Sequence, residues 1–147
     1  MTTKDTDIQV LLDTAFKTLD KIPPTRIHSV VCAAYTKDNT IITSFNVKHY
    51  TGAPCAEQAV LGAACAQGYL PKDLTCLVAV SETRRIVINP CGKCRQMLQD
   101  ICEHIKIVVR DSEGKLSVVG IQELLPFPYH VRTGEELVLP IMSVNEP

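Results

Sequence analysis

The sequence predicts an α/β protein in which helices cover both faces of a β-sheet. Segments with apolar residues at helical spacing alternate with short apolar segments of strand length. One of these short segments, residues 74–80, is apolar almost throughout, which is typical of a strand that is buried on both faces. We therefore expect one sheet between two layers of helices.

The first part of the chain predicts a helix followed by a β-hairpin. Residues 8–22 carry apolar side chains at helical spacing, and Pro23-Pro24 ends the pattern. Residues 29–36 and 40–46 are rich in β-branched and aromatic side chains and flank a turn-like polar segment. These two segments therefore predict paired antiparallel strands.

The remaining elements alternate between helix and strand. Residues 55–67 are rich in alanine, begin after Pro54 and end before Gly68, which predicts a buried helix. The other expected elements are strands at 74–80, 86–88, 105–110 and 115–119, a helix at 91–102 and a helical turn at 121–125. From this division we expect one domain over residues 1–130 and a C-terminal extension of unknown role over residues 131–147.

Composition argues against two classes of partner. Lys and Arg total 15 and Asp and Glu total 16, which gives a formal net charge of -1, and aromatic residues make up only 5 % with no tryptophan. Nucleic-acid binding normally requires a basic surface or stacking aromatic side chains, so we expect no nucleic-acid partner. No apolar stretch is long enough for a membrane span, so we expect no membrane partner either.

The seven cysteines are expected to be free thiols or metal ligands. The polar and acidic segment at residues 1–7 does not resemble a secretory signal, so we expect a cytoplasmic protein, and disulfides are rare in the reducing cytoplasm. Four of the cysteines lie within apolar segments and are expected to be buried hydrophobic side chains. These four are Cys32, Cys65, Cys76 and Cys102.

The other three cysteines lie where helices are expected to begin. Cys55 follows Pro54, and Cys91 and Cys94 follow Pro90. The positive end of a helix favours thiolates, and two cysteines three residues apart on a helix can face one ion. Three thiolates leave one tetrahedral position open, which distinguishes a catalytic zinc site from a closed structural site.

Glu57, two residues after Cys55, is placed to act on a metal-bound water rather than on the metal. A Cys-x-x-Cys pair alone is more often a redox pair or half of a structural zinc site. Its combination with Cys-Ala-Glu 36 residues upstream is typical of zinc deaminases instead. The alternative for Glu57 is an ordinary acidic residue in the first turn of a helix.

The two motifs together resemble the cytidine deaminase family, and most closely its blasticidin S deaminase branch. The resemblance rests on Thr-Gly-Ala-Pro-Cys-Ala-Glu at residues 51–57 and Asn-Pro-Cys-Gly-Lys-Cys-Arg-Gln at residues 89–96. Phe-Asn-Val at residues 45–47 and Glu-Leu-Leu-Pro at residues 123–126 extend it. It implies a three-layer α/β/α sandwich with a mixed five-stranded sheet, in a homotetramer whose subunits complete one another's pockets.

The resemblance also implies the reaction and the roles of single residues. Cys55, Cys91 and Cys94 match the ligands of one Zn²⁺ per chain, Glu57 matches the catalytic acid, and Asn46 matches a residue that binds the sugar of a nucleoside. Water activated by zinc attacks C4 of a cytosine ring while Glu57 protonates N3, and Glu57 then delivers a proton to the departing ammonia. The products are ammonia and the uracil form of the ring.

Departures from the family pattern bear on the substrate. Lys48 stands where cytidine deaminases have Glu and the blasticidin branch has Tyr, and a lysine can pair with the carboxylate of blasticidin S. Tyr129 matches an aromatic residue of that branch, whereas Val131 replaces its Trp. Gln58 stands where three-cysteine members often carry an Arg that offsets the thiolate charge. Lys93 and Arg95 are then the nearest cations in the sequence.

Three functions therefore remain open from the sequence. The first is a zinc-dependent deaminase of a free cytosine nucleoside or of a blasticidin S-type nucleoside antibiotic, which would confer antibiotic resistance. The second is a housekeeping cytidine or deoxycytidine deaminase of pyrimidine salvage. The third, from a different class, is a noncatalytic zinc-binding module, in which a protein group such as a histidine would fill the fourth position of the metal.

Overall fold

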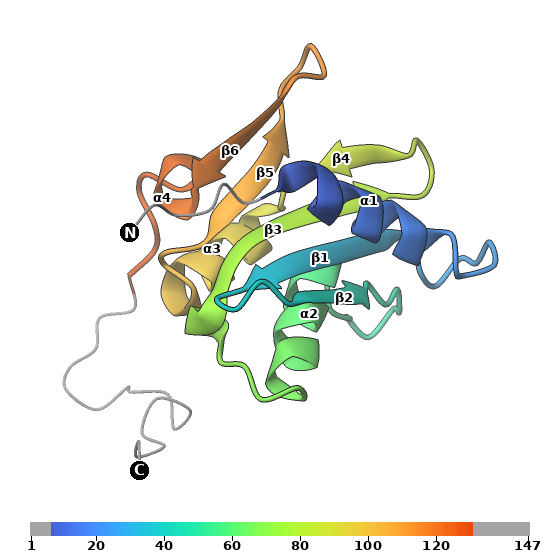
Figure 1. Ribbon diagram of the computed structural model, residues 1–147, viewed down its shortest axis with the longest axis horizontal. Helices are drawn as coiled ribbons and strands as arrows, with labels where there is room; N and C mark the ends of the chain where they lie inside the picture. The colour runs from blue at the N-terminus through green and yellow to red at the C-terminus, as the bar shows by residue number, and fades with distance from the viewer. Residues whose placement is uncertain (1–6, 131–147) are drawn as a thin grey trace.

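The computed structural model describes residues 7–130 of the chain (Figure 1). The residues of the expected C-terminal extension therefore lie outside the described part. The helices are α1 (Ile8–Leu19), α2 (Ala56–Cys65), η1 (Pro71–Asp73, a 3₁₀ turn), α3 (Gly92–Ile101) and α4 (Ile121–Leu124). The strands are β1 (Val30–Thr36), β2 (Ile41–Phe45), β3 (Leu74–Ser81), β4 (Ile86–Ile88), β5 (Lys106–Arg110) and β6 (Leu116–Gly120).

Each helix and strand expected from the sequence is present, and their boundaries differ by a few residues. The largest difference is at the end of α1, which was expected to reach Ile22 but ends at Leu19. Lys21 and Ile22 continue the chain with hydrogen bonds to carbonyls three residues earlier, a tighter pattern than that of an α-helix. The apolar periodicity thus runs one turn beyond the helix.

The sheet has six strands, so the expectation of five was wrong. The main path runs β2-β1-β3-β5-β6, and β4 pairs with β3 beside this path. The β3–β5 pair is parallel and the other pairs are antiparallel, so the sheet is mixed as expected. The additional strand is β4, whose three residues were already expected to be extended from the sequence.

Two strands share one edge of β3. On its other edge, β3 pairs with β1 along its whole length. On the shared edge, β5 pairs only with Cys76 and Leu77, and β4 pairs from Ala79 to Ser81. The sheet therefore forks where the partner of β3 changes from β5 to β4.

The three-layer architecture is confirmed by the packing on the two faces of the sheet. Successive residues of β1 point to opposite faces, so that Val31 and Ala33 pack with α1 whereas Cys32 and Ala34 pack with α2. Figure 1 shows α1 on one side of the sheet and α2 and α3 on the other. None of the helices in residues 7–130 is long and apolar enough to span a lipid bilayer.

Candidate active site

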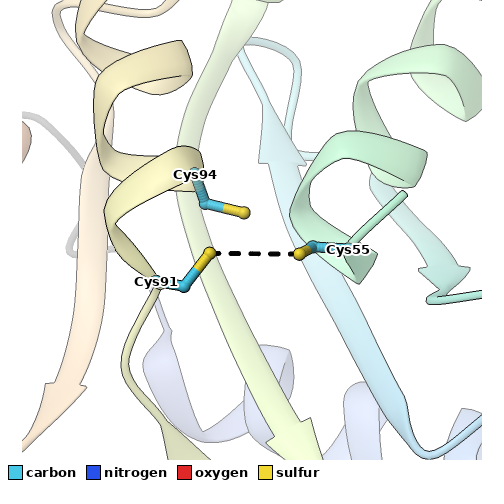
Figure 2. Close-up of side chains that lie close together, drawn as sticks. All are labelled: Cys55, Cys91 and Cys94. Atoms are coloured by element: carbon cyan, nitrogen blue, oxygen red, sulfur yellow. Dashed lines mark hydrogen bonds between the residues drawn. The ribbon is translucent and has the colours of Figure 1, made fainter. Parts of the chain in front are cut away.

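The three cysteines at the helix starts come together in the structure. Cys55 immediately precedes α2, Cys91 immediately precedes α3, and Cys94 lies in the first turn of α3 (Figure 2). The Sγ atoms of Cys55 and Cys91 are 4.0 Å apart, and all three sulfurs lie within 4.8 Å of one another. Zn–S bonds of about 2.3 Å at tetrahedral angles place two sulfurs about 3.8 Å apart, so the cluster fits a zinc ion.

No histidine takes part in this cluster. Within residues 7–130, Cys55, Cys91 and Cys94 form the one group of three or more Cys, His, Asp or Glu side chains with ligand atoms this close together. The chain therefore offers three thiolate ligands in this part of the molecule. Three ligands and one open position are the arrangement of catalytic rather than structural zinc.

The backbone at both helix starts is organised by hydrogen bonds to the cysteine carbonyls. The Cys55 carbonyl accepts from the backbone N–H groups of Gln58 (3.1 Å) and Ala59 (3.0 Å), and the Cys91 carbonyl accepts from Arg95 N–H (2.9 Å). The Gln58 side chain returns to the start of α2, where its Oε1 accepts from Cys55 N–H at 3.1 Å. Both helices therefore direct their positive ends toward the cluster, which favours thiolates.

The thiols differ in acidity. Burial raises the pKa of the Cys55 thiol and, aided by the charge of Glu57, raises that of Cys94 far above its usual range. Burial also opposes ionisation of Cys91, but hydrogen bonds from Cys94, Cys55 and the Lys93 backbone outweigh it and lower its pKa. Since zinc binds thiolates, it would displace protons from the thiols when it binds.

Glu57 lies in the first turn of α2 and is almost completely buried, with 4 % of its surface exposed. Burial raises the pKa of its carboxyl group, and an interaction with the Cys94 thiol opposes this rise. Glu57 therefore lies next to the sulfur cluster and is largely shielded from water. A raised pKa lets a carboxyl group hold a proton more readily and return it, as general acid–base catalysis requires.

A small cavity opens beside the cluster. Its volume is about 130 Å³. It is lined by Val30, Asn46, Cys55, Ala56, Glu57, Ile88, Asn89 and Cys91. A second hollow, of about 480 Å³, lies between Glu103, β6 and α4 and is lined by none of the clustered cysteines. The smaller cavity is therefore the one in which the chemically active side chains meet.

Asn46 lines this cavity but already has hydrogen-bond partners in the chain. Its Oδ1 accepts from the backbone N–H groups of Ser29 (2.8 Å) and Val30 (2.9 Å). Its Nδ2 lies 3.5 Å from Ser29 Oγ. The side chain thus holds the start of β1, and its amide remains at the cavity wall where a ligand could reach it.

Lys48 and Tyr129 do not line the cavity within one chain. Lys48 is exposed and is fixed by its backbone N–H, which donates to the Ile27 carbonyl at 2.8 Å. Tyr129 is 71 % exposed. The Gln96 side chain donates through Nε2 to the Tyr129 carbonyl at 2.8 Å, and its Oε1 accepts from Tyr129 N–H at 2.9 Å. Neither of these two expected substrate contacts is therefore part of the cavity wall that one chain forms.

The two expected cations also differ in position. Lys93 is exposed, whereas Arg95 is partly buried. Arg95 donates through Nε to the Pro90 carbonyl at 2.8 Å and through Nη1 to the Leu124 carbonyl at 3.3 Å. The guanidinium group thus braces the backbone just before Cys91 as well as bringing a positive charge to this helix start.

Sequence reasoning did not single out Asn89 as part of the site. It belongs to the motif at residues 89–96 but carried no role of its own there, yet it lines the cavity and its side chain bonds to the end of β5. The sequence signals were its place in that motif and its position two residues before Cys91. Ile88 and Val30 also line the cavity and carried no signal beyond their strand pattern.

The fold and the cysteine cluster define a zinc-binding protein of the deaminase class. The chain belongs to the cytidine and deoxycytidylate deaminase family, because residues 5–110 match the model of its zinc-binding region. This membership confirms zinc as the cofactor expected from the sequence, and the three cysteines are the residues that could hold it.

Relatives and solved structures agree with this assignment. The chain is 30 % identical over 125 residues to a cytidine deaminase of Halalkalibacterium halodurans, with 82 % of this chain and 92 % of the relative covered. The crystal structure of cytidine deaminase from Burkholderia pseudomallei is similar with a TM-score of 0.67 and 28 % identity, over 82 % of this chain and 98 % of that one. The crystal structure of cytidine deaminase from Mycobacterium leprae is similar with a TM-score of 0.66 and 27 % identity, over 82 % of this chain and 98 % of that one.

Proposed function

We propose that this protein is a hydrolytic deaminase that converts the cytosine ring of a free nucleoside to the uracil form and releases ammonia. Cytidine or deoxycytidine is the first candidate substrate, because the relatives named above are cytidine deaminases. The observation that carries the proposal is the buried Glu57 beside three convergent cysteine sulfurs. A noncatalytic zinc module has no need of a buried carboxylate at this position.

In the proposed mechanism the protein's own groups hold the metal and move the proton. Cys55, Cys91 and Cys94 would hold zinc, which when bound supplies a Lewis acid that makes water a nucleophile at neutral pH. The Glu57 carboxylate accepts a proton from the attacking water and donates it to N3 of the ring. It then accepts the second proton, from the hydroxyl group now on C4, and passes it to the departing amine, so that the C4–N bond breaks and the C4 carbonyl forms. Burial favours this role because it raises the pKa of the Glu57 carboxyl group.

Replacement of Glu57 tests the mechanism directly. Glu57→Gln keeps the shape of the side chain and removes its ability to accept a proton, so kcat with cytidine should fall by roughly 10²- to 10⁴-fold. Zinc content should remain one ion per chain, as measured by atomic absorption. The exposed Glu113 supplies a control, and Glu113→Gln should leave both quantities unchanged.

Two results would contradict the proposal. Turnover by Glu57→Gln within threefold of the wild type would remove Glu57 from the chemistry. Stoichiometric zinc in a wild-type protein that deaminates neither cytidine, deoxycytidine nor blasticidin S would favour the noncatalytic module.

A homotetramer is part of the proposal. The cavity of about 130 Å³ is smaller than the roughly 300–1,000 Å³ of ordinary ligand pockets, so one chain does not enclose a whole nucleoside. Tyr50, Phe127 and Tyr129 are between 71 % and 94 % exposed, which is typical of aromatic side chains at interfaces. In the proposed assembly, Tyr129 acts as a substrate contact in a pocket that a partner subunit completes. Light scattering of the purified protein should give four times the chain mass.

Blasticidin S is the second candidate substrate, and Lys48 is the residue that bears on it. Lys48 is two residues from Asn46 on the segment that leads away from the cavity, and its side chain is exposed. If it pairs with the carboxylate of this antibiotic, Lys48→Met should lower kcat/KM for blasticidin S by about two- to fivefold, the size of an exposed ion pair, and leave cytidine unchanged. Equal losses of kcat/KM with both substrates would show that Lys48 does not determine which substrate the protein prefers.

The remaining proposals concern the whole chain. We place the protein in the cytoplasm, with its catalytic unit in residues 1–130, on the basis of the sequence. A truncation after residue 130 would test the division, since it should fold and deaminate like the full chain. Val131 and the rest of the extension lie outside the described residues.

A further inference from the structure

The side chain of Asn89 forms a two-point contact with the backbone of Arg110. Nδ2 of Asn89 donates to the Arg110 carbonyl at 2.9 Å, and Oδ1 accepts from Arg110 N–H at 2.9 Å. The amide group thereby satisfies both backbone groups of one residue, as a neighbouring strand would. Asn89 directly follows β4, and Arg110 is the last residue of β5.

This contact lies where the sheet forks. The β3–β5 ladder ends at the Leu77–Ile107 pair, whereas β4 occupies the same edge of β3 from Ala79 onward. Arg110 is three residues beyond the end of that ladder, so β3 does not hold it in place. The Asn89 side chain therefore connects the two branches of the fork, β4 and β5.

The same contact fixes the approach to a metal ligand. Only Pro90 separates Asn89 from Cys91, and the proline ring restricts φ in this short link. The carbonyl of Pro90 is in turn held by Arg95 Nε at 2.8 Å. Asn89 and Cys91 also line the same cavity. The segment from Asn89 to Cys91 is thus clamped at one end to β5 and at the other to α3.

We propose that Asn89 is a positioning residue of the zinc centre, which holds the sulfur of Cys91 at the distance from Cys55 that a shared metal ion requires. Without the contact to Arg110, the link before Cys91 would be anchored only through β4 and Arg95. The metal would then bind to a less preorganised set of sulfurs. The inference rests on the zinc centre of the proposed function and is independent of the substrate.

Metal binding tests this inference without reference to catalysis. Asn89→Leu keeps the branched shape and removes both hydrogen bonds, and Asn89→Ala removes the side chain. Because Asn89 is exposed, neither change opens a buried void. We expect both variants to bind Zn²⁺ 10- to 100-fold more weakly, the usual cost of losing a group that orients a metal ligand, in competition with a chromophoric chelator. Titration with Co²⁺ should show altered thiolate–cobalt absorption bands.

The residue after Arg110 provides a matched control. Asp111 accepts from the backbone N–H groups of Glu113 and Lys115, each at 2.9 Å, so Asp111→Ala also removes two hydrogen bonds at this end of β5. Its Zn²⁺ affinity should remain within twofold of the wild type. Both Asn89 variants binding within twofold of the wild type, or Asp111→Ala losing as much affinity as they do, would overturn the inference alone. A wild-type chain that takes up neither metal would overturn the proposed function as well.

Discussion

The two helix starts that form the metal centre are held in place in different ways. At the start of α2, the residues that organise Cys55 are its neighbours in the sequence: Gln58 accepts from the Cys55 N–H three residues earlier, and Glu57 lies in the same turn. This half of the site brings one sulfur and the acid. Its geometry follows from a single helical turn.

At the start of α3, contacts from distant parts of the chain add to the local bonds that Arg95 makes to the Cys91 and Pro90 carbonyls. Asn89 bonds to Arg110, 21 residues away, and Arg95 bonds to the Leu124 carbonyl, 29 residues away. This half brings the two sulfurs of Cys91 and Cys94, and it takes its position from β5 and α4. The comparison indicates that the acid is positioned locally, whereas most of the metal ligation depends on the completed sheet.

Removal of one sulfur from the long-range half should have the largest effect. Cys94 is completely buried, and Cys94→Ala leaves two thiolates for a metal that normally takes three or more protein ligands. We expect zinc content well below one per chain and deamination at the background of the assay. Cys65 was expected to be buried, but it is exposed because it lies at the end of α2, and Cys65→Ala should keep both. Stoichiometric zinc in Cys94→Ala would show that Cys94 is not required for ligation.

The pH dependence of zinc binding should reflect the protonation of thiols in both halves. Burial raises the pKa values of Cys55 and Cys94, so at neutral pH both hold protons that zinc must displace. Higher pH removes this competition, and each displaced proton contributes about a factor of ten per pH unit. Apparent zinc affinity should therefore rise roughly a hundredfold or more between pH 6.5 and 7.5, measured against a chelator of known pH dependence. A slope below tenfold per unit would mean that both thiols are already ionised.

These thiols should also differ in reactivity when zinc has been removed. The pKa of Cys91 is lowered and its side chain is exposed, whereas Cys94 is buried and its pKa is raised. Since the thiolate is the reactive form, iodoacetamide should alkylate Cys91 before Cys94 in the metal-free protein, as followed by peptide mass spectrometry. Earlier reaction at Cys94 would mean that Cys94, and not Cys91, is the more acidic thiol at the start of α3.

The fold and the residues of the cysteine cluster could be predicted from the sequence. The pattern of apolar residues identified α1 and the central strand β3. A helix buried on one face has apolar residues at helical spacing, and a strand buried on both faces is apolar almost throughout. The positions of Cys55 and Glu57 followed from one expected helix start, and those of Cys91 and Cys94 followed from another. Even the sixth strand, β4, was visible as an apolar segment, although the family resemblance implied five.

Long-range positions could not be predicted in this way. The contact between Asn89 and Arg110 depends on where the sheet forks, and a pattern of single residues does not encode which strand ends meet. Lys48 and Tyr129 were expected at the substrate, but loop paths place both outside the cavity of a single chain. Side chains that act across loops or subunits are fixed by tertiary and quaternary packing rather than by local spacing.

The smallest effects on zinc affinity are expected from Arg95 and Gln58, the side chains that support the two helix starts. Arg95→Gln removes the planar donor set that reaches the Pro90 and Leu124 carbonyls, and zinc affinity should fall by about tenfold because Cys91 and Cys94 lose a common support. Arg95→Lys keeps the charge but not the fork geometry, so it should lose nearly as much. A lysine that restores full affinity would mean that Arg95 acts by offsetting thiolate charge instead.

Gln58→Ala is the matching change in the local half. It removes one hydrogen bond to Cys55 N–H and should lower the free energy of unfolding in urea by about 1 kcal/mol. Zinc affinity should stay within threefold of the wild type, because the backbone bonds from Gln58 and Ala59 to the Cys55 carbonyl remain and continue to hold the turn. If Gln58→Ala weakened zinc binding as much as Arg95→Gln, both helix starts would depend equally on side-chain braces, and the distinction between a local and a long-range half would fail.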